Sequence, residues 1–226
     1  FRPMYRIFLK RLFDIITAIL VLVLVSPLMI PVIVILMLTG EHYVWYFQDR
    51  VGYKNKQFRI WKFATMLKAS PSMGTGSITT KNDPRVFPFG QYLRKTKINE
   101  LPQLMNVLNG TMSVVGPRPQ MEVDYLNFPK EIQKTIYNVK PGISGIGSIV
   151  FRDEEKWFSK VTDVHEYNRT HIAPYKGALE IWYQNHLNFY TDFMLIFLTI
   201  WAIVRPNNQV VYKVFKDLPE KPKELK

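Results

Sequence analysis

Basic side chains gather in one stretch of the sequence, and each lies beside a turn or an expected helix start. They are Lys62, Arg85, Arg94, Lys95, Lys97 and Arg118. Of these, we expect Lys62, Arg85, Arg94 and Arg118 to bind phosphate. Proline stands next to Arg85 and Arg118, and it stiffens the backbone that presents each guanidinium. Arginine binds phosphate oxygens through two parallel hydrogen bonds. The stretch therefore predicts a binding site for an anion such as a phosphate.

Asn99 and Glu100 stand just before an expected helix at 101–108. A helix N-terminus attracts phosphate, and Asn99 is expected to cap this one. Glu100 is the carboxylate at the edge of the anion site, and it could hold a divalent cation that bridges phosphate oxygens. The simpler interpretation is that Asn99 only caps the helix and that Glu100 only interacts with the helix dipole.

Both strands and helices are expected to position these residues. Two runs rich in β-branched and aromatic residues surround a Gly/Lys/Asn turn within 43–66, which predicts a β-hairpin. Apolar spacing predicts helices elsewhere, and Gly, Ser, Thr and Pro predict loops. The helices are expected at 89–97, 101–108 and 175–204, a loop at 68–82, a turn-rich connection at 139–148, and a surface or disordered tail after Arg205.

A segment of 24 residues without charge runs from Ile15 to Leu38. As a helix it would measure roughly 36 Å, enough to cross a bilayer. Pro27 and Pro31 remove two backbone hydrogen bonds near its middle, and Ser26 can satisfy a freed carbonyl. Basic residues flank the segment on both sides, so they give no direction across a membrane. A re-entrant helix broken at Ser26 and Pro27 and a spanning helix both stay open.

The composition restricts the chemistry further. The chain has 226 residues, no cysteine and a formal net charge of +12. The lack of cysteine excludes disulfides, thiol catalysis and zinc sites with cysteine ligands. The positive charge suits phosphorylated substrates, nucleic acid or an anionic membrane surface. The sequence contains no nucleic-acid-binding motif, so we expect no nucleic-acid partner.

Several short motifs follow one another in a fixed order. They are "KRLFD", an apolar stretch broken by "SP", "RVG", "KFxTM", "DPR", "LRKT", "ELPQLxNVLxGxMSxVGPRP" and "KPGISG". In this order they resemble the bacterial sugar transferase family, the monotopic polyprenyl-phosphate phosphoglycosyl transferases. The likeness covers roughly 10–204, most of the chain.

This resemblance implies an α+β fold that is mainly helical. A small cytoplasmic domain with a short β-hairpin is attached to an N-terminal re-entrant membrane helix, broken at Ser26 and Pro27. We expect the membrane helix at 1–40, the catalytic domain at 41–190, and an interfacial C-terminal helix with its tail at 191–226. The three parts would form one functional unit over 10–204. The C-terminal helix would contact membrane lipid or form a homodimer.

The resemblance also implies an activity. Family members transfer a phosphosugar from a UDP-sugar to undecaprenyl phosphate on the cytoplasmic face of the bacterial inner membrane. They release UMP and begin capsule, O-antigen or exopolysaccharide synthesis. Their catalytic Asp-Glu pair falls on Asn99 and Glu100 here, with Mg²⁺ associated with Glu100. Lys62, Arg94 and Arg118 match basic positions of the family motifs.

Asn99 departs from the family pattern, because an amide is a poor nucleophile where the family has a carboxylate. Glu100 could attack instead, or the lipid phosphate could displace UMP directly. Asn99 could also be a substitution that traps a complex. A last alternative is a catalytically inactive, membrane-anchored homologue that binds nucleotide sugar. We favour an active transferase, because the rest of the motif is retained.

Overall fold

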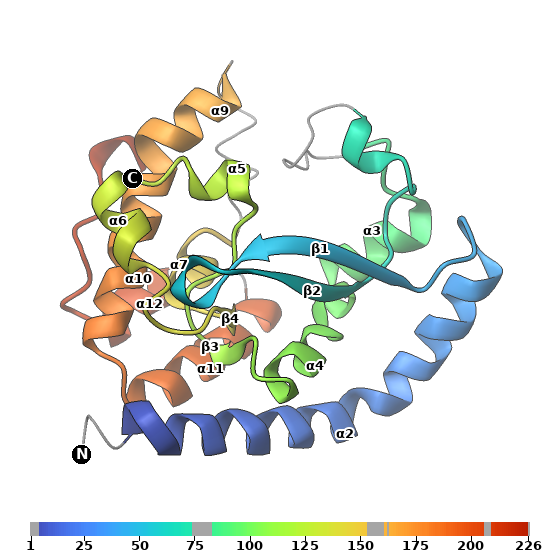
Figure 1. Cartoon of the computed structure of the whole chain (residues 1–226), viewed down its shortest axis with the longest axis horizontal. Coiled ribbons are helices and arrows are strands. Elements are labelled where there is room, and N and C mark those ends of the chain that lie inside the picture. The colour runs from blue at the N-terminus through green and yellow to red at the C-terminus, as the bar shows by residue number, and fades with distance from the viewer. Residues whose placement is uncertain (1–4, 74–82, 153–160, 162, 206–208, 226) are drawn as a thin grey trace.

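The computed structural model describes residues 5–73, 83–152, 161, 163–205 and 209–225. The described chain is mainly helical and contains two small two-stranded sheets (Figure 1). The helices are η1 (Tyr5–Leu9), α2 (Lys10–Leu38), η2 (Tyr53–Asn55), η3 (Ser70–Ser72), α3 (Pro88–Lys95), η4 (Ile98–Glu100), α4 (Gln103–Leu108), α5 (Glu122–Tyr125), α6 (Lys130–Thr135), α7 (Ile146–Val150), α9 (Val164–Tyr167), η5 (Asn168–Ile172), α10 (Ala173–Asn185), α11 (Phe189–Val204), α12 (Gln209–Val214) and η6 (Lys223–Leu225). The strands are β1 (Trp45–Val51), β2 (Gln57–Phe63), β3 (Ser113–Val115) and β4 (Gly142–Ser144).

The expected β-hairpin is confirmed as the antiparallel pair β1 and β2, which lies in the middle of Figure 1. Lys54 and Asn55 in the connecting loop both have positive φ, 55° and 58°. Asn106 of α4 joins the hairpin through its side-chain amide. It accepts a hydrogen bond from the Trp61 N–H at 2.9 Å and donates one to the Arg59 carbonyl at 2.7 Å. These two hydrogen bonds fix β2 against α4, the helix that follows Glu100.

A second sheet was not expected from the sequence. β3 and β4 pair in parallel, with Ser113 opposite Gly142 and Val115 opposite Ser144. The turn-rich stretch at 139–148 therefore contains a strand. A Cβ on Gly142 would lie 2.1 Å from the Gly116 nitrogen, so only glycine permits this close approach of the two backbones.

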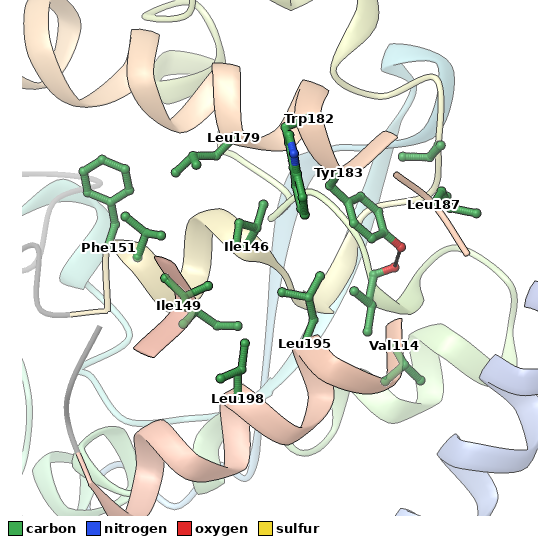
Figure 2. Close-up of a cluster of buried hydrophobic side chains, with 14 of the residues drawn as sticks. Val114, Ile146, Ile149, Phe151, Leu179, Trp182, Tyr183, Leu187, Leu195 and Leu198 are labelled. Atoms are coloured by element: carbon green, nitrogen blue, oxygen red, sulfur yellow. Dashed lines mark hydrogen bonds between the residues drawn. The ribbon is translucent and has the colours of Figure 1, made fainter. Parts of the chain in front are cut away.

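The main hydrophobic core lies between α7, α10 and α11 (Figure 2). The expected single helix at 175–204 is two helices, because the chain breaks at 186–188. The Asn188 side chain accepts a hydrogen bond from the Thr191 N–H at 3.0 Å and so begins α11. The break lets Leu179 of α10 and Leu195 of α11 face the same core, and both are fully buried. The one-helix prediction was wrong at this cap.

The C-terminal tail is also ordered, contrary to expectation. α12 and η6 pack back onto the core, where Val211, Phe215 and Leu225 are buried. The Trp182 indole donates to the Asp217 carboxylate at 3.0 Å. These apolar positions outweigh the Pro- and Lys-rich composition that predicted a surface or disordered tail.

The apolar segment forms one uninterrupted helix, α2, so the expected break at Ser26 and Pro27 is not seen. The ribbon of α2 does change direction along its course (Figure 1). Pro27 leaves the Val23 carbonyl without its helical partner. The Ser26 hydroxyl donates to that carbonyl at 2.9 Å, as expected. By length and composition α2 could cross a membrane, and only 17% of its most apolar stretch is buried in the protein.

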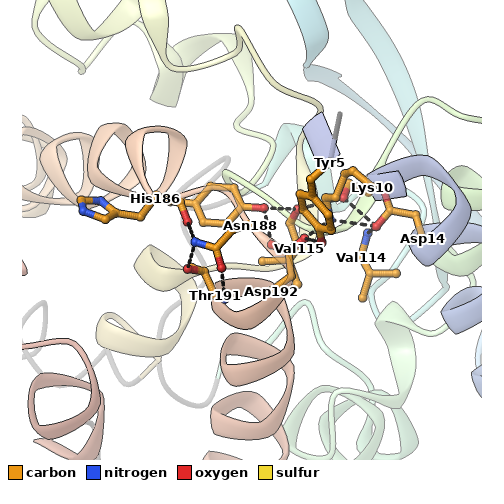
Figure 3. A network of polar contacts seen from close by, with 11 residues as sticks. Tyr5, Lys10, Asp14, Val114, Val115, His186, Asn188, Thr191 and Asp192 are labelled. Carbon is orange, nitrogen blue, oxygen red and sulfur yellow. Dashed lines mark hydrogen bonds and ion pairs between the residues drawn. The ribbon is translucent and has the colours of Figure 1, made fainter. Parts of the chain in front are cut away.

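A buried polar network joins the start of α2 to the rest of the fold (Figure 3). The Lys10 ammonium lies 2.9 Å from Asp14 and 2.8 Å from Asp192 of α11. The Asp192 carboxylate also accepts hydrogen bonds from Tyr5 and Tyr183, both at 2.7 Å. Asp14 accepts two more from β3, one from the Ser113 hydroxyl and one from the Val114 N–H. We call this group the Lys10 network.

Candidate active site

Glu100 and Arg118 form a two-pronged ion pair at the end of η4. Nη2 of Arg118 lies 2.7 Å from Oε1 of Glu100, and Nη1 lies 3.2 Å from Oε2. The Glu100 side chain is 13% exposed and that of Arg118 is 31% exposed. The two residues are 18 positions apart in the sequence, and the fold brings together the two motif residues that the sequence placed in one site.

Other basic side chains surround this ion pair. Burial works against ionisation of the Glu100 carboxyl, but Arg118, Lys62 and Lys97 together lower its pKa well below the usual range. Arg94, at the end of α3, also acts on Lys62 and Lys97. The cluster thus contains three of the four residues predicted to bind phosphate, Lys62, Arg94 and Arg118. We call these cations, with Lys97 and Arg50, the cation cluster.

Positive charge in the cation cluster exceeds what Glu100 balances. Burial lowers the pKa of Lys62 well below its ordinary value, and Arg50, Arg118 and Arg94 lower it further. Burial and then Arg118 lower the pKa of Arg50 to about 10. Cations whose pKa values are lowered by neighbouring cations gain free energy when an anion binds among them. The cluster is therefore suited to a ligand with several negative charges.

Arg50 is a site residue that the sequence analysis missed. The hairpin register places Tyr46 opposite Lys62 and Arg50 opposite Phe58. Side chains of one strand alternate between two faces, so Tyr46 and Arg50 lie on the same face as Lys62. The Arg50 guanidinium donates to the Pro119 carbonyl at 3.3 Å, next to Arg118. The alternation within the predicted hairpin, combined with the "RVG" motif, is the signal that could have revealed it.

The backbone of the "GPRP" segment is held from two sides. The Tyr137 hydroxyl donates to the Arg118 carbonyl at 2.9 Å and accepts from the Gln120 N–H at 3.0 Å. The Gln120 carbonyl accepts from the Val51 N–H at 2.8 Å, which joins the segment to the end of β1. These bonds limit the positions from which Arg118 can extend toward Glu100.

Asn99 is buried beside Glu100, with 6% of its surface exposed. The expectation that it caps a helix was wrong. Residues 98–100 form a separate 3₁₀ turn, entered through Lys97 at a φ of 61°, and α4 begins only after Pro102. Within the described parts of the chain, the Asn99 side-chain oxygen has no hydrogen-bond partner. A buried carbonyl oxygen without a partner is costly, and it lies at the centre of the predicted catalytic motif.

Arg85 differs from the other predicted phosphate-binding residues. Its guanidinium lies 2.6 Å from Asp83, and it donates to the carbonyls of Ser70 and Met73 at 3.2 and 2.9 Å. The side chains of Arg85 and Asp83 are each 3% exposed. These contacts order the backbone around η3, and a role of Arg85 in phosphate binding stays a prediction.

Three known proteins are similar to this chain over most of its length. One is the UDP-N-acetylgalactosamine-undecaprenyl-phosphate N-acetylgalactosaminephosphotransferase of Aeromonas hydrophila, 35% identical over 204 residues, which are 89% of this chain and 45% of the relative. The uncharacterized sugar transferase EpsL of Bacillus subtilis is 34% identical over 196 residues, 87% of either chain. The UDP-glucose:undecaprenyl-phosphate glucose-1-phosphate transferase of Escherichia coli is 33% identical over 196 residues, which are 85% of this chain and 39% of the relative.

The chain therefore spans less than half the length of the Aeromonas and Escherichia relatives, and most of EpsL. The family model described as "Bacterial sugar transferase" matches residues 5–206. This match includes the Lys10 network, the hairpin and every member of the cation cluster. The chain belongs to the bacterial sugar transferase family.

Proposed function

We propose that this protein transfers a phosphosugar from a UDP-sugar to undecaprenyl phosphate and releases UMP, as a first step of exopolysaccharide, capsule or O-antigen synthesis. The observation that carries the proposal is the cation cluster, in which Glu100 stands among five basic side chains and Asp124 acts on one of them, Arg50. A diphosphate supplies the missing negative charge. The names of the Aeromonas and Escherichia relatives join a UDP-sugar with undecaprenyl phosphate, and the comparisons give no support to an inactive homologue.

The acceptor lipid requires a site at a membrane. Between its buried ends α2 exposes large apolar side chains, among them Leu20, Val23 and Leu24, each at least 65% exposed. α11 exposes a second apolar face that includes Phe193 and Phe197. We assign both faces to membrane lipid rather than to a homodimer, at the cytoplasmic face of the bacterial inner membrane. The bend in α2 and the Ser26 bond to a freed carbonyl support a re-entrant helix.

The residues of the cation cluster would act mainly through charge. An oxygen of the lipid phosphate attacks the β-phosphorus of the UDP-sugar, the bond from this phosphorus to the bridging oxygen breaks, and UMP leaves with the electron pair. Arg118, Lys62 and Arg94 bind the phosphate oxygens and stabilise the charge that develops on them. Because Lys62 has a lowered pKa, we expect the bound diphosphate to raise it and keep Lys62 protonated.

Asn99 decides which route is available. Its neutral amide cannot form the acyl phosphate that an aspartate carboxylate forms when it attacks phosphorus. Glu100 is strongly stabilised as an anion by Arg118, which makes its carboxylate a weak nucleophile. We therefore propose direct displacement by the lipid phosphate, without a phosphosugar bound covalently to the protein.

A magnesium ion fits this site only together with the substrate. The described residues contain no group of three or more acidic or histidine side chains that could hold a metal ion alone. Glu100 and the unpaired Asn99 oxygen are two suitable oxygen ligands, and phosphate oxygens and water would complete the shell, as is usual for Mg²⁺. When bound, Mg²⁺ would offset negative charge on the diphosphate.

Release of UMP from a panel of UDP-sugars tests the proposed function. The protein in detergent, with undecaprenyl phosphate and Mg²⁺, should release UMP from at least one donor, and Glu100→Gln should not. Omission of undecaprenyl phosphate distinguishes the routes. Direct displacement predicts no UMP from this chain without acceptor, whereas Asn99→Asp should give a burst close to one UMP per protein. No release from any donor, with or without Asn99→Asp, would contradict the transferase proposal.

A further inference from the structure

An isolated acidic side chain, Glu180, lies inside the fold on α10. It is 1% exposed, and within the described residues neither carboxyl oxygen has a hydrogen-bond partner of good geometry. Burying a carboxyl group without such partners is costly, so its presence calls for a reason. Neither the proposed transfer step nor the hydrophobic core uses it.

Glu180 faces two backbone segments that end near the cation cluster. The backbone N–H groups of Arg118 and Gly147 lie near enough to its carboxyl group to favour the ionised form and lower its pKa. The approach to the "GISGIG" turn is close. A Cβ on Gly147 would come within 2.4 Å of Oε1 of Glu180, and a Cβ on Gly145 within 3.7 Å of Oε2. Both glycines leave space for this carboxyl group.

The face of α10 that carries Glu180 also contacts β3, the strand that leads to Arg118. Three residues after Glu180, the Tyr183 hydroxyl, which donates to Asp192 at 2.7 Å, also lies 3.0 Å from the Val115 carbonyl oxygen. At Arg118 itself, the Tyr137 hydroxyl donates to the backbone carbonyl at 2.9 Å. The backbone of Arg118 is therefore approached by Tyr137 at its carbonyl and by Glu180 at its N–H.

We propose that Glu180 is a positioning residue that fixes the backbone of Arg118, so that the guanidinium meets Glu100 and the substrate phosphates. The inference rests on the proposed function and deepens it. The guanidinium of Arg118 is partly exposed and ends a long side chain. The point from which that side chain starts decides whether both nitrogens reach Glu100 at once.

The charge state of Glu180 specifies how it would act. Burial raises its pKa to about 8, although Lys176, the two backbone N–H groups and Arg118 oppose the rise, and Tyr137 also lies within electrostatic reach. At neutral pH the side chain is thus mostly a neutral carboxyl group. Glutamine reproduces its length and neutrality. Aspartate keeps the acid but is one methylene shorter.

The test compares Glu180→Gln with Glu180→Asp in the full chain in detergent, with Mg²⁺ and undecaprenyl phosphate. The measurements are UMP release and the binding of UDP by calorimetry. We expect Asp to lower kcat/KM and the affinity for UDP by about tenfold or more, and Gln to rescue both to within about threefold of the parent. Glu166→Gln, at an exposed carboxylate on α9, is the matched charge control and should change neither. Leu179→Ala controls for lost core packing on α10.

A double substitution separates positioning from general support of the fold. If Glu180 acts through Arg118, then Glu180→Asp should add less than about twofold to the loss of UDP affinity caused by Arg118→Ala. Equal effects of Gln and Asp, or additive losses in the double variant, would overturn the inference while the proposed function stands. A parent chain that neither releases UMP nor binds UDP would overturn both.

Discussion

The Lys10 network and the cation cluster are both buried groups of charges. They differ in whether each charge has a partner of opposite sign. In the Lys10 network one ammonium lies between two carboxylates, those of Asp14 and Asp192, at 2.9 and 2.8 Å. Hydroxyl and N–H groups from four further residues donate to the same carboxylates. Each charge has a partner of opposite sign, as a buried ionic group requires for stability.

The cation cluster is incomplete by the same standard. Five cations surround Glu100, and Asp124 acts on one of them, Arg50. The pKa values of Lys62 and Arg50 are still lowered by burial and by neighbouring cations. In the part of the chain that the structure describes, the Asn99 oxygen beside Glu100 has no hydrogen-bond partner. The comparison teaches that a complete network joins parts of a fold, whereas an unbalanced one at comparable depth is prepared for a ligand.

Arg118→Ala, in the cation cluster, should show the largest difference between its effect on activity and its effect on stability. We expect UMP release to fall about a thousandfold, because an arginine that stabilises charge on a transferring phosphoryl group contributes at least that much. Glu100 keeps Lys62 and Lys97 as neighbours, so the free energy of unfolding should fall by less than about 3 kcal/mol, the loss expected when a buried charge is left with no partner. Turnover assays and urea unfolding in detergent measure the two effects. Unchanged turnover would remove Arg118 from the site.

Asp192→Asn should have the reverse effect. The substitution keeps the shape but removes one of the two carboxylates around Lys10, and it leaves the Tyr5 or Tyr183 hydroxyl without its acceptor. We expect the free energy of unfolding to fall by about 3 kcal/mol. Asp49→Asn is the control, because its ion pair with Arg59 is mostly exposed and should contribute less than about 1 kcal/mol. Equal losses from both variants would mean that the Lys10 network has no special structural role.

Local sequence patterns predicted much of the fold. The β-hairpin and the helices at Pro88–Lys95 and Gln103–Leu108 follow from residue type and spacing within short windows. The pairing of β3 with β4 does not, because two three-residue strands some thirty positions apart carry no local signal. The ordered tail depends on the same kind of distant packing, which single-sequence patterns do not specify.

The site was predictable in part. Motif order identified Lys62, Arg94, Glu100 and Arg118, and the structure brings them together. The unpaired state of Asn99 could not be predicted, because it depends on a 3₁₀ turn that separates it from the start of α4. The role of one acid among the apolar positions of α10 likewise depends on which backbone it faces.

Glu180 stands between the two kinds of group, since it is buried like the Lys10 network and incomplete like the cation cluster. Its pKa is raised from an ordinary 4.5 to about 8, so the folded protein binds more protons than the unfolded chain between these values. Stability should therefore fall as pH rises from about 4.5 to about 8, by about 2 kcal/mol or more. Glu180→Gln should lose this dependence. Unfolding of both proteins at pH 5, 6, 7 and 8 measures it, and parallel curves would contradict the raised pKa.

Arg85 offers the smallest and sharpest test of the comparison, because it was predicted for one group and is built like the other. Its guanidinium is paired with Asp83 and with the carbonyls of Ser70 and Met73. Arg85→Lys keeps the charge, but a lysine ammonium cannot span these acceptors as the planar guanidinium does. If Arg85 only orders the backbone around η3, the variant should lose about 1 kcal/mol of stability. The KM for the UDP-sugar should then change by less than about threefold.

A rise in KM of about tenfold at unchanged stability would instead place Arg85 among the residues that bind the diphosphate. The matched variant Arg94→Lys, at a position already within the cation cluster, calibrates the assay, since it should raise KM without a loss of stability. A paired, buried arginine that still governed substrate affinity would break the rule drawn from the two groups, because completeness of local partners would then no longer separate structural charges from functional ones.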